Sequence, residues 1–227
     1  MSETVKIVVP VALKEIFEII APSFTSATGH GFESAIMLNP EVPAHIAGGA
    51  DWSIALSNPV YIDQIVAAGD CDGGTRMLGS APLAFAVRGH EDAPALRDPH
   101  LIASFLRDAE SIGITELGTS GAQFARLAEG LGISREMLGK LRLLPGGGPM
   151  KALLAGEVDV AGLPLSNIAP VEGVTPRAIC PLELGVHIDL AFCVRAGANT
   201  ATRSFGAWIT SADVVERMRP LGVLKDA

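Results

Sequence analysis

Two apolar runs divide this chain: LAFAV at residues 83–87 and LAFCV at residues 190–194. Each is a continuous hydrophobic run of the length expected for a buried strand. A set of alternating strand and helix patterns precedes the first run, and a second set lies between the two. We therefore expect two α/β lobes joined by two strands, with residues 1–82 plus 190–227 in lobe 1 and residues 83–189 in lobe 2.

The local patterns favour a largely parallel sheet covered by helices. Residues 5–9 predict a strand, and apolar residues at helical spacing follow it: Leu13, Ile16, Phe17 and Ile20. Further strands are expected at residues 34–38, 53–56, 112–117, 141–144 and 158–163. The last helices are expected around Trp208 and over residues 211–218.

Composition limits the function classes. The chain has 227 residues, of which 48% are hydrophobic, enough for a large core. Its net charge of -8 and lack of a basic run argue against nucleic acid or an anionic membrane as partner. No apolar run approaches the roughly 20 residues that span a bilayer, so no membrane insertion is expected. With no signal peptide, the chain as written is expected in the cytoplasm, or in the periplasm if it is a trimmed mature form.

The three cysteines, Cys71, Cys180 and Cys193, are scattered and share no C-x-x-C spacing. This pattern argues against a disulfide framework and against a zinc site, and it favours buried reduced thiols. No motif for a nucleotide or a metal ion occurs either, so no cofactor is expected.

The main binding signal is Gly118-Thr119-Ser120-Gly121, which lies between an expected strand and an expected helix. Backbone N–H groups and two hydroxyls at a helix start favour a small anion or a carboxylate. The alternative is that Thr119 or Ser120 only caps the helix. A serine nucleophile elbow is not indicated, because Ala122 stands where its last glycine belongs.

The order of three further motifs resembles the molybdate-binding branch of the type II periplasmic solute-binding proteins. VALKE at residues 11–15 is similar to that family's ASLKE, ADWSIALS at 50–57 to its ADVFIS, and AGEVDVAG at 155–162 to its GEAEIG. The resemblance covers nearly the whole chain. It implies a two-lobe α/β fold with two hinge strands and a ligand in an interlobe cleft, and an ABC permease as partner if the chain is exported.

The resemblance also implies candidate ligand contacts after strands and at helix starts: Ala12, Leu13, Asn39, Ser57, Thr119, Ser120, Gly121, Gly147, Gly148 and Ser166. Ala12 and Asn39 stand where the family has hydroxyl side chains, which disfavours molybdate and tungstate. The remaining donors suit a small organic carboxylate or another oxyanion.

Two functions stay open. The first is a binding protein of the ABC importer type that closes on its anionic ligand. The second is a cofactor-independent isomerase of the aconitate isomerase type, which resembles the same branch. In that case His187 is the candidate base or acid, and Ser120, Thr119 and Asn39 are the candidate donors. A purely structural role for His187 is also open.

Overall fold

The computed structural model describes residues 3–90 and 92–224. The chain has an α/β fold that divides into two compact units. Unit 1 comprises Met1–Ser80, Asp189–Pro220 and Leu224–Ala227, and unit 2 comprises Ala81–Ile188 and Leu221–Val223. The divisions expected from the two apolar runs lie after residues 82 and 189, with the whole C-terminal segment in lobe 1.

Unit 1 is built on three parallel strands in the order β2-β1-β3, with β9 antiparallel beside β3. The strands are β1 (Thr4–Pro10), β2 (Gly31–Met37), β3 (Ile54–Ser57) and β9 (His187–Arg195). The helices are η1 (Val11–Leu13), α1 (Lys14–Thr28), η2 (Asn39–Glu41), α2 (Val42–Ala47), α3 (Pro59–Ala67), α8 (Thr200–Ile209) and α9 (Ala212–Met218).

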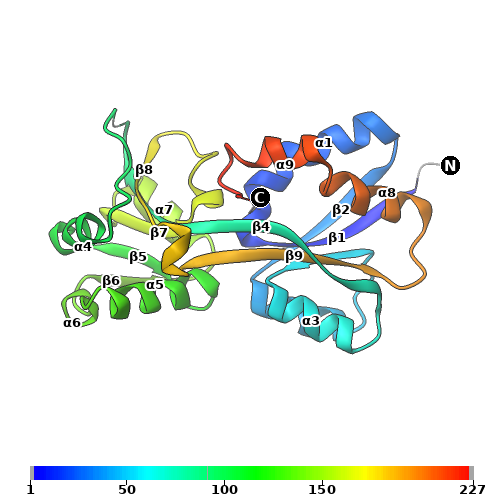
Figure 1. Cartoon of the computed structure of the whole chain (residues 1–227), viewed down its shortest axis with the longest axis horizontal. Coiled ribbons are helices and arrows are strands. Elements are labelled where there is room, and N and C mark those ends of the chain that lie inside the picture. Colours follow the sequence, from blue (N-terminus) through cyan, green and yellow to red (C-terminus); the bar gives the residue numbers. More distant parts are fainter. Residues whose placement is uncertain (1–2, 91, 225–227) are drawn as a thin grey trace. The chain divides into compact units, whose positions relative to one another are not determined.

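Helices cover both faces of these strands, with α1, α8 and α9 on one face and α3 on the other (Figure 1). On the first face an aromatic cluster joins α1 to α8, with the rings of Phe24 and Phe205 4.9 Å apart. On the second face, Val8 and Ala55 pack with Ile46 and Ile62 of α2 and α3. Side chains of one strand point alternately to the two faces, so apolar strands bury both sides.

Unit 2 is built on the strand order β4-β7-β5-β6, with β8 also paired to β4. The strands are β4 (Cys71–Arg88), which lies in unit 1 up to Ser80, β5 (Ile112–Thr115), β6 (Leu141–Leu144), β7 (Val160–Pro164) and β8 (Val174–Ile179). The helices are α4 (Pro99–Asp108), α5 (Thr119–Gly130), α6 (Ser134–Met137), α7 (Gly148–Ala155), η3 (Leu165–Asn167) and η4 (Leu182–Leu184).

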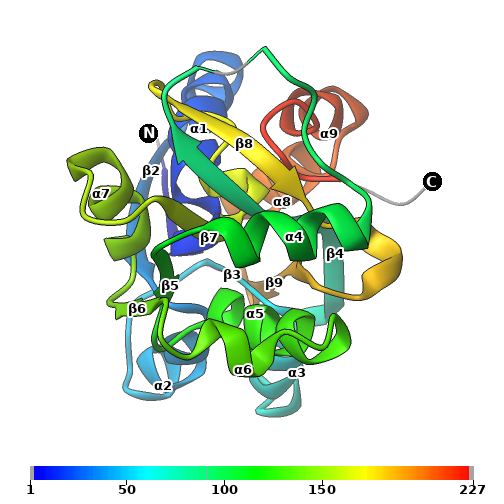
Figure 2. The same ribbon diagram turned by 90° about the vertical axis from the view of Figure 1, so that its left-hand side faces the viewer.

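The alternation of β4 shows how unit 2 fills its core. Leu83 and Phe85 pack with α4, α5 and α6 on one face, whereas Ala84 and Ala86 pack with α7 on the other. Figure 2, which looks toward this unit, shows α7 apart from the group formed by α4, α5 and α6. The parallel strands β5, β6 and β7 therefore lie between two helical layers.

The structure corrects the expected sheet in two respects. The sheet is mixed, because β9 is antiparallel to β3 and β4 is antiparallel to both β7 and β8. In addition, β4 begins at Cys71, twelve residues before the apolar run at 83–87 that was expected to form the strand. Its first half is largely exposed and polar, so it carries no hydrophobic signal. The helix α4 and the strand β8 were not predicted.

The segment Leu221–Val223 belongs to unit 2, not to unit 1 as expected. The reason is a close backbone contact between Gly222 and η3. A Cβ atom at Gly222 would lie 2.7 Å from the carbonyl carbon of Leu165 and 2.8 Å from the nitrogen of Ser166. Gly222 also has a φ of +89°, in the region that favours glycine. Only glycine fits this position without a shift of the backbone.

Candidate functional site

The candidate residues of unit 1 gather at one edge of its sheet. Because β1, β2 and β3 are parallel, their carboxyl ends meet at the same edge. The register pairs Pro10 with Met37 and Val8 with Ala55, so the three strands end almost level. Ala12 and Leu13 in η1, Asn39 in η2 and Ser57 at the end of β3 follow directly.

Asn39 is the centre of a buried set of hydrogen bonds at this edge. Its Oδ1 accepts from the Ser57 hydroxyl at 3.0 Å and from the Asn58 backbone N–H at 3.1 Å. The Asn58 side-chain amide in turn donates to the carbonyl of Asp189 at 2.5 Å. A backbone N–H can only donate, so the amide atom of Asn39 that faces it is the oxygen, and the Nδ2 donors lie on the other side. The side chain of Asn39 can therefore offer a ligand only its Nδ2 donors. Its Oδ1 has a structural role, because it already accepts two hydrogen bonds.

The two η1 candidates differ in character from Asn39. The side chains of both Ala12 and Leu13 are buried, at 7% and 5% exposure. Leu13 lies with Ile16, Phe17 and other apolar side chains around a small apolar space of unit 1. Its side chain therefore belongs to the core, and Ala12 offers no hydroxyl.

Unit 2 repeats this arrangement at the carboxyl ends of its parallel strands. The register pairs Thr115 of β5 with Leu144 of β6, and Ile114 with Gly162 of β7. The elements α5, α7 and η3 follow β5, β6 and β7. Thr119, Ser120 and Gly121, Gly147 and Gly148, and Ser166 thus share one edge of this sheet.

The start of α5 is not capped by a side chain. Its N-cap is Gly118, so neither Thr119 nor Ser120 is the cap, and the capping alternative is wrong. The first bond within the helix runs from the Ala122 N–H to the Gly118 carbonyl at 3.4 Å. The backbone N–H groups at this helix start lie at the positive end of the helix dipole.

Gly121 holds this helix start against the end of β5. A Cβ atom there would lie 2.2 Å from the carbonyl oxygen of Thr115, far below a normal contact. The first turn of α5 therefore packs directly on the last residue of the strand. Thr115, buried at 5% exposure, was not among the predicted residues, although a polar residue at the end of an apolar strand was a usable signal.

Gly147 and Gly148 serve the turn before α7. Gly147 is the N-cap with a φ of +76°, and a Cβ atom at Gly148 would lie 2.8 Å from the Leu144 Cβ. The Gly148 N–H donates to the Pro145 carbonyl at 2.8 Å, so it is occupied within the turn. This corrects the expectation that both glycines present backbone donors.

Ser166 and His187 complete the predicted set. Ser166 in η3 is fully buried, and its backbone nitrogen lies close to Gly222. His187 is the half-buried first residue of β9 and belongs to unit 2, as Ser120 does.

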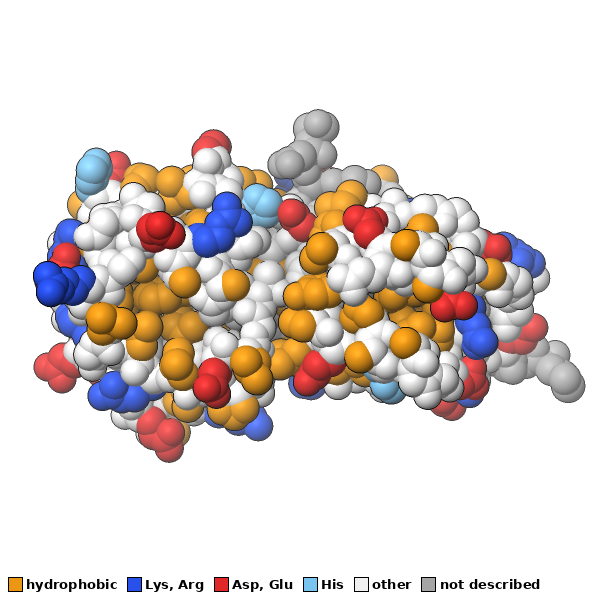
Figure 3. All heavy atoms as spheres, turned by 90° about the horizontal axis from the view of Figure 1, so that it is seen from below, with side chains coloured by type: hydrophobic (Ala, Val, Ile, Leu, Met, Phe, Trp, Pro, Cys, Tyr) orange, Lys and Arg blue, Asp and Glu red, His pale blue; other side chains and the backbone are white. Residues whose placement is uncertain are grey.

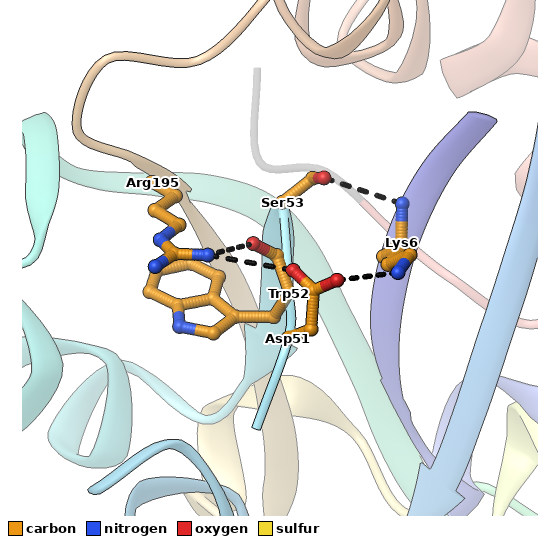
Figure 4. A network of polar contacts seen from close by, with 5 residues as sticks. All are labelled: Lys6, Asp51, Trp52, Ser53 and Arg195. Atoms are coloured by element: carbon orange, nitrogen blue, oxygen red, sulfur yellow. Dashed lines mark hydrogen bonds and ion pairs between the residues drawn. The ribbon is translucent and has the colours of Figure 1, made fainter. Parts of the chain in front are cut away.

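A charged network in unit 1 lies at the opposite edge of that sheet. Lys6 of β1 contacts the Asp51 carboxylate, and Arg195 of β9 approaches Asp51 at 3.5 Å and the Trp52 carbonyl at 3.3 Å (Figure 4). The hydrogen bond between Lys6 and Asp51 raises the pKa of the lysine and lowers that of the carboxyl. Both cations already face a carboxylate at the amino ends of β1 and β3, so this network does not suit an anionic ligand.

Unit 2 also has an apolar hollow of about 250 Å³ between α5, α6 and β6. Its lining includes Phe124, Met137, Leu138 and Leu143. Figure 3 shows that hydrophobic side chains gather on the face that carries α5 and α6. With so few polar groups, this hollow does not match the chemistry of an anion.

Metal and membrane sites have no support within residues 3–90 and 92–224. No group of three or more His, Cys, Asp or Glu side chains there could hold a metal ion. None of the helices in that part of the chain has both the length and the apolar character needed to cross a membrane.

A family model described as bacterial extracellular solute-binding protein matches residues 5–222. No curated protein matches this chain. Among solved structures, the periplasmic molybdate-binding protein of Azotobacter vinelandii is similar with a TM-score of 0.79 and 15% identity, over 98% of this chain and 100% of that chain. The sulfate-binding protein of Mycobacterium tuberculosis H37Rv reaches 0.72 and 15% identity, over 97% and 86%.

A third similar structure is Peb3 of Campylobacter jejuni, with a TM-score of 0.70 and 13% identity over 98% of this chain and 100% of that chain. PEB3 has also been solved with L-phospholactate bound. At these identities the likeness shows the fold, which is that of the type II periplasmic binding proteins. The predicted resemblance to the molybdate-binding branch is confirmed.

Proposed function

Because this chain belongs to the bacterial extracellular solute-binding proteins, we propose that it is the solute receptor of an ABC importer and binds a small oxyanion. The similar structures are named for molybdate, sulfate and L-phospholactate, which are all oxyanions. The observation that carries the proposal is the start of α5. There the positive end of a helix dipole and two hydroxyl-bearing residues of the first turn, Thr119 and Ser120, lie at the carboxyl ends of parallel strands, a combination that suits an anion.

Within this class we propose a small organic acid in preference to molybdate. A tetrahedral metal oxyanion needs hydrogen-bond donors on every side, because it has no apolar part. Ala12 supplies no hydroxyl, and Asn39 offers only its Nδ2 donors because Ser57 and Asn58 occupy its oxygen. An organic acid needs fewer donors, since one carboxylate or phosphate group carries its charge.

A ligand panel tests the choice of anion. The purified chain is titrated with molybdate, sulfate, phosphate, L-phospholactate, malate and citrate by calorimetry, after a thermal-shift screen. We expect the tightest binding from one of the organic acids. Submicromolar binding of molybdate would contradict our account of Ala12 and Asn39.

A pair of serine variants tests the site itself, with the tightest anion of the panel as probe. Ser120→Ala removes a hydroxyl at the start of α5, and loss of one hydrogen bond to a charged group costs roughly 1.5–3 kcal/mol, about ten- to hundredfold in affinity. The control is Ser134→Ala, which removes an exposed hydroxyl at the start of α6, before β6. The proposal fails if both variants bind the anion as the parent chain does.

The expected partner is an ABC permease, and the expected compartment lies outside the cytoplasm, as the role of this family requires. Fractionation of the native host followed by immunodetection tests this. Recovery of the protein from the cytoplasmic fraction alone would argue against an importer. The isomerase alternative has no support from the family or from the similar structures, and we do not propose it.

A further inference from the structure

Cys71 and Cys193 come together in unit 1, although 121 residues separate them in the sequence. Cys71 begins β4, Cys193 lies near the end of β9, and these two strands pair. The Ala196 N–H donates to the Asp70 carbonyl at 2.8 Å, which holds the start of β4 beside the end of β9. Both cysteine side chains pack in the same hydrophobic cluster, with Cys193 buried in it and the partly buried Cys71 packed against it.

The two thiols differ in access and in acidity. Cys71 is half-buried and can be reached from solvent, whereas Cys193 has no exposed surface. The neighbouring Cys193 thiol lowers the pKa of Cys71, whereas the neighbouring Cys71 thiol raises the pKa of Cys193, and burial raises it further. Cys71 is thus suited to be the attacking thiolate, and Cys193 keeps its proton beside it.

We propose that Cys71 and Cys193 form a reversible disulfide that links β4 to β9 within unit 1. The oxidant is a small disulfide such as oxidised glutathione. The Cys71 thiolate attacks one of its sulfurs and releases one glutathione thiolate, which leaves a mixed disulfide on Cys71. The Cys193 sulfur then attacks the Cys71 sulfur, and its proton passes to the second glutathione as that leaves. Two cysteine thiols are oxidised and one glutathione disulfide is reduced to two thiols.

The surroundings favour this disulfide over other uses of the two thiols. Within the described part of the chain, no third metal-binding side chain joins them in a cluster that could hold a metal ion. The chain passes from unit 1 to unit 2 within β4, after Ser80, and returns to unit 1 within β9, between Ile188 and Asp189. The disulfide therefore fixes these two strands to each other at their unit 1 ends.

Cys180 provides an internal comparison. It lies in unit 2 with 1% of its surface exposed, and burial raises its pKa to about 12. Among the described residues of its hydrophobic cluster there is no second cysteine, so Cys180 has no thiol beside it with which to form a disulfide. The structure therefore assigns one reactive pair and one inert thiol.

The test uses the full wild-type chain. The reduced protein is incubated with oxidised glutathione, unfolded in acid, and its thiols are counted; the expected change is from three thiols to one. Mass spectrometry should show a loss of about 2 Da and a cross-linked peptide pair that contains Cys71 and Cys193, and dithiothreitol should reverse both. Three remaining thiols, or glutathione retained on Cys71, would overturn the proposal.

Three variants assign the partners. Cys71→Ser and Cys193→Ala should each abolish the cross-link, and Cys180→Ala should keep it with no free thiol left. A cross-link that persists in Cys71→Ser or disappears in Cys180→Ala would contradict the assignment. The peptide map of the wild-type chain decides the question even where a buried variant folds poorly.

Discussion

At the scale of single residues, the glycines of α5 show why residue type alone does not reveal a role. Gly121 and Gly130 belong to the same helix, and both are glycine in a position where alanine is the better helix former. Gly121 lies against the Thr115 carbonyl, whereas nothing lies within 4 Å of a Cβ atom at Gly130. The first is required by packing and the second is not.

Gly121→Ala and Gly130→Ala should therefore have opposite effects. The added methyl at Gly121 overlaps the strand backbone, and overpacking of this kind costs about 1–3 kcal/mol of unfolding free energy. At Gly130 the same change should stabilise by up to about 1 kcal/mol through helix propensity. Urea unfolding of the two variants measures this. Equal changes in unfolding free energy at both sites would mean that the first turn of α5 does not pack against β5.

The buried Cys180 should make stability depend on pH in the alkaline range. Burial raises its pKa from 9.0 to about 12, so between these values the unfolded chain loses the proton and the folded chain keeps it. The stabilisation is complete below pH 9.0 and is lost as pH rises to about 12. The slope is up to about 1.4 kcal/mol per pH unit for one group.

Urea unfolding at pH 8 and pH 10 checks this, with Cys180→Ala as the comparison. The variant should lose less stability than the parent chain over that interval. An identical loss in both proteins would assign the alkaline effect to other groups.

At the scale of elements, the loop after β2 is tied to β3 across the end of β1. The strand order β2-β1-β3 puts β1 between them, yet Asn39 of η2 bonds to Ser57 of β3 at 3.0 Å. The turn after β2 thus reaches past the end of β1 to the end of β3. The hydrogen bond between Ser57 and Asn39 therefore fixes the backbone that carries the candidate donors of unit 1.

Ser57→Ala should loosen this tie. The Ser57 hydroxyl is fully buried and also lies 3.1 Å from the Asn39 carbonyl, so its removal leaves a buried acceptor with fewer donors. The expected cost is about 1–3 kcal/mol of unfolding free energy. Ser34→Ala, at an exposed position of β2, should stay within about 0.5 kcal/mol. Denaturant midpoints that do not differ between the two variants would show that the tie contributes little.

At the scale of the whole molecule, net charge opposes the proposed ligand. A chain with a formal charge of -8 repels an approaching anion at long range, so binding must come from local donors and a helix dipole. Because the repulsion acts at long range and the attraction at short range, the association rate constant of the anion should depend on salt concentration.

The association rate constant of the anion should rise when salt is added. Between about 0.01 M and 0.15 M salt the screening length falls from about 30 Å to about 8 Å, which removes most of the repulsion. Stopped-flow measurement with the tightest anion of the panel, at constant pH, gives the rate constant at each salt concentration. A rate that falls with salt would instead indicate an attractive field around the site, which is unexpected for so acidic a chain.

The sequence by itself determined the α/β class, most of the alternating strands and helices, although not α4 or β8, and the position of the anion-binding candidates after the strands. These features depend on hydrophobic spacing within about ten residues, which the sequence displays directly. The resemblance in motif order also identified the family, because motifs at helix starts and strand ends keep their place along the chain.

Only the tertiary structure decided which of these residues meet. Five features require a partner strand or turn: the antiparallel β9, the polar first half of β4, the tie from Asn39 to Ser57, the contact of Gly121 with Thr115, and the shared cluster of Cys71 and Cys193. Several of these partners are more than a hundred residues away, or belong to a turn whose direction no local pattern specifies. Their contacts are set by the packing of whole elements, which hydrophobic spacing alone does not encode.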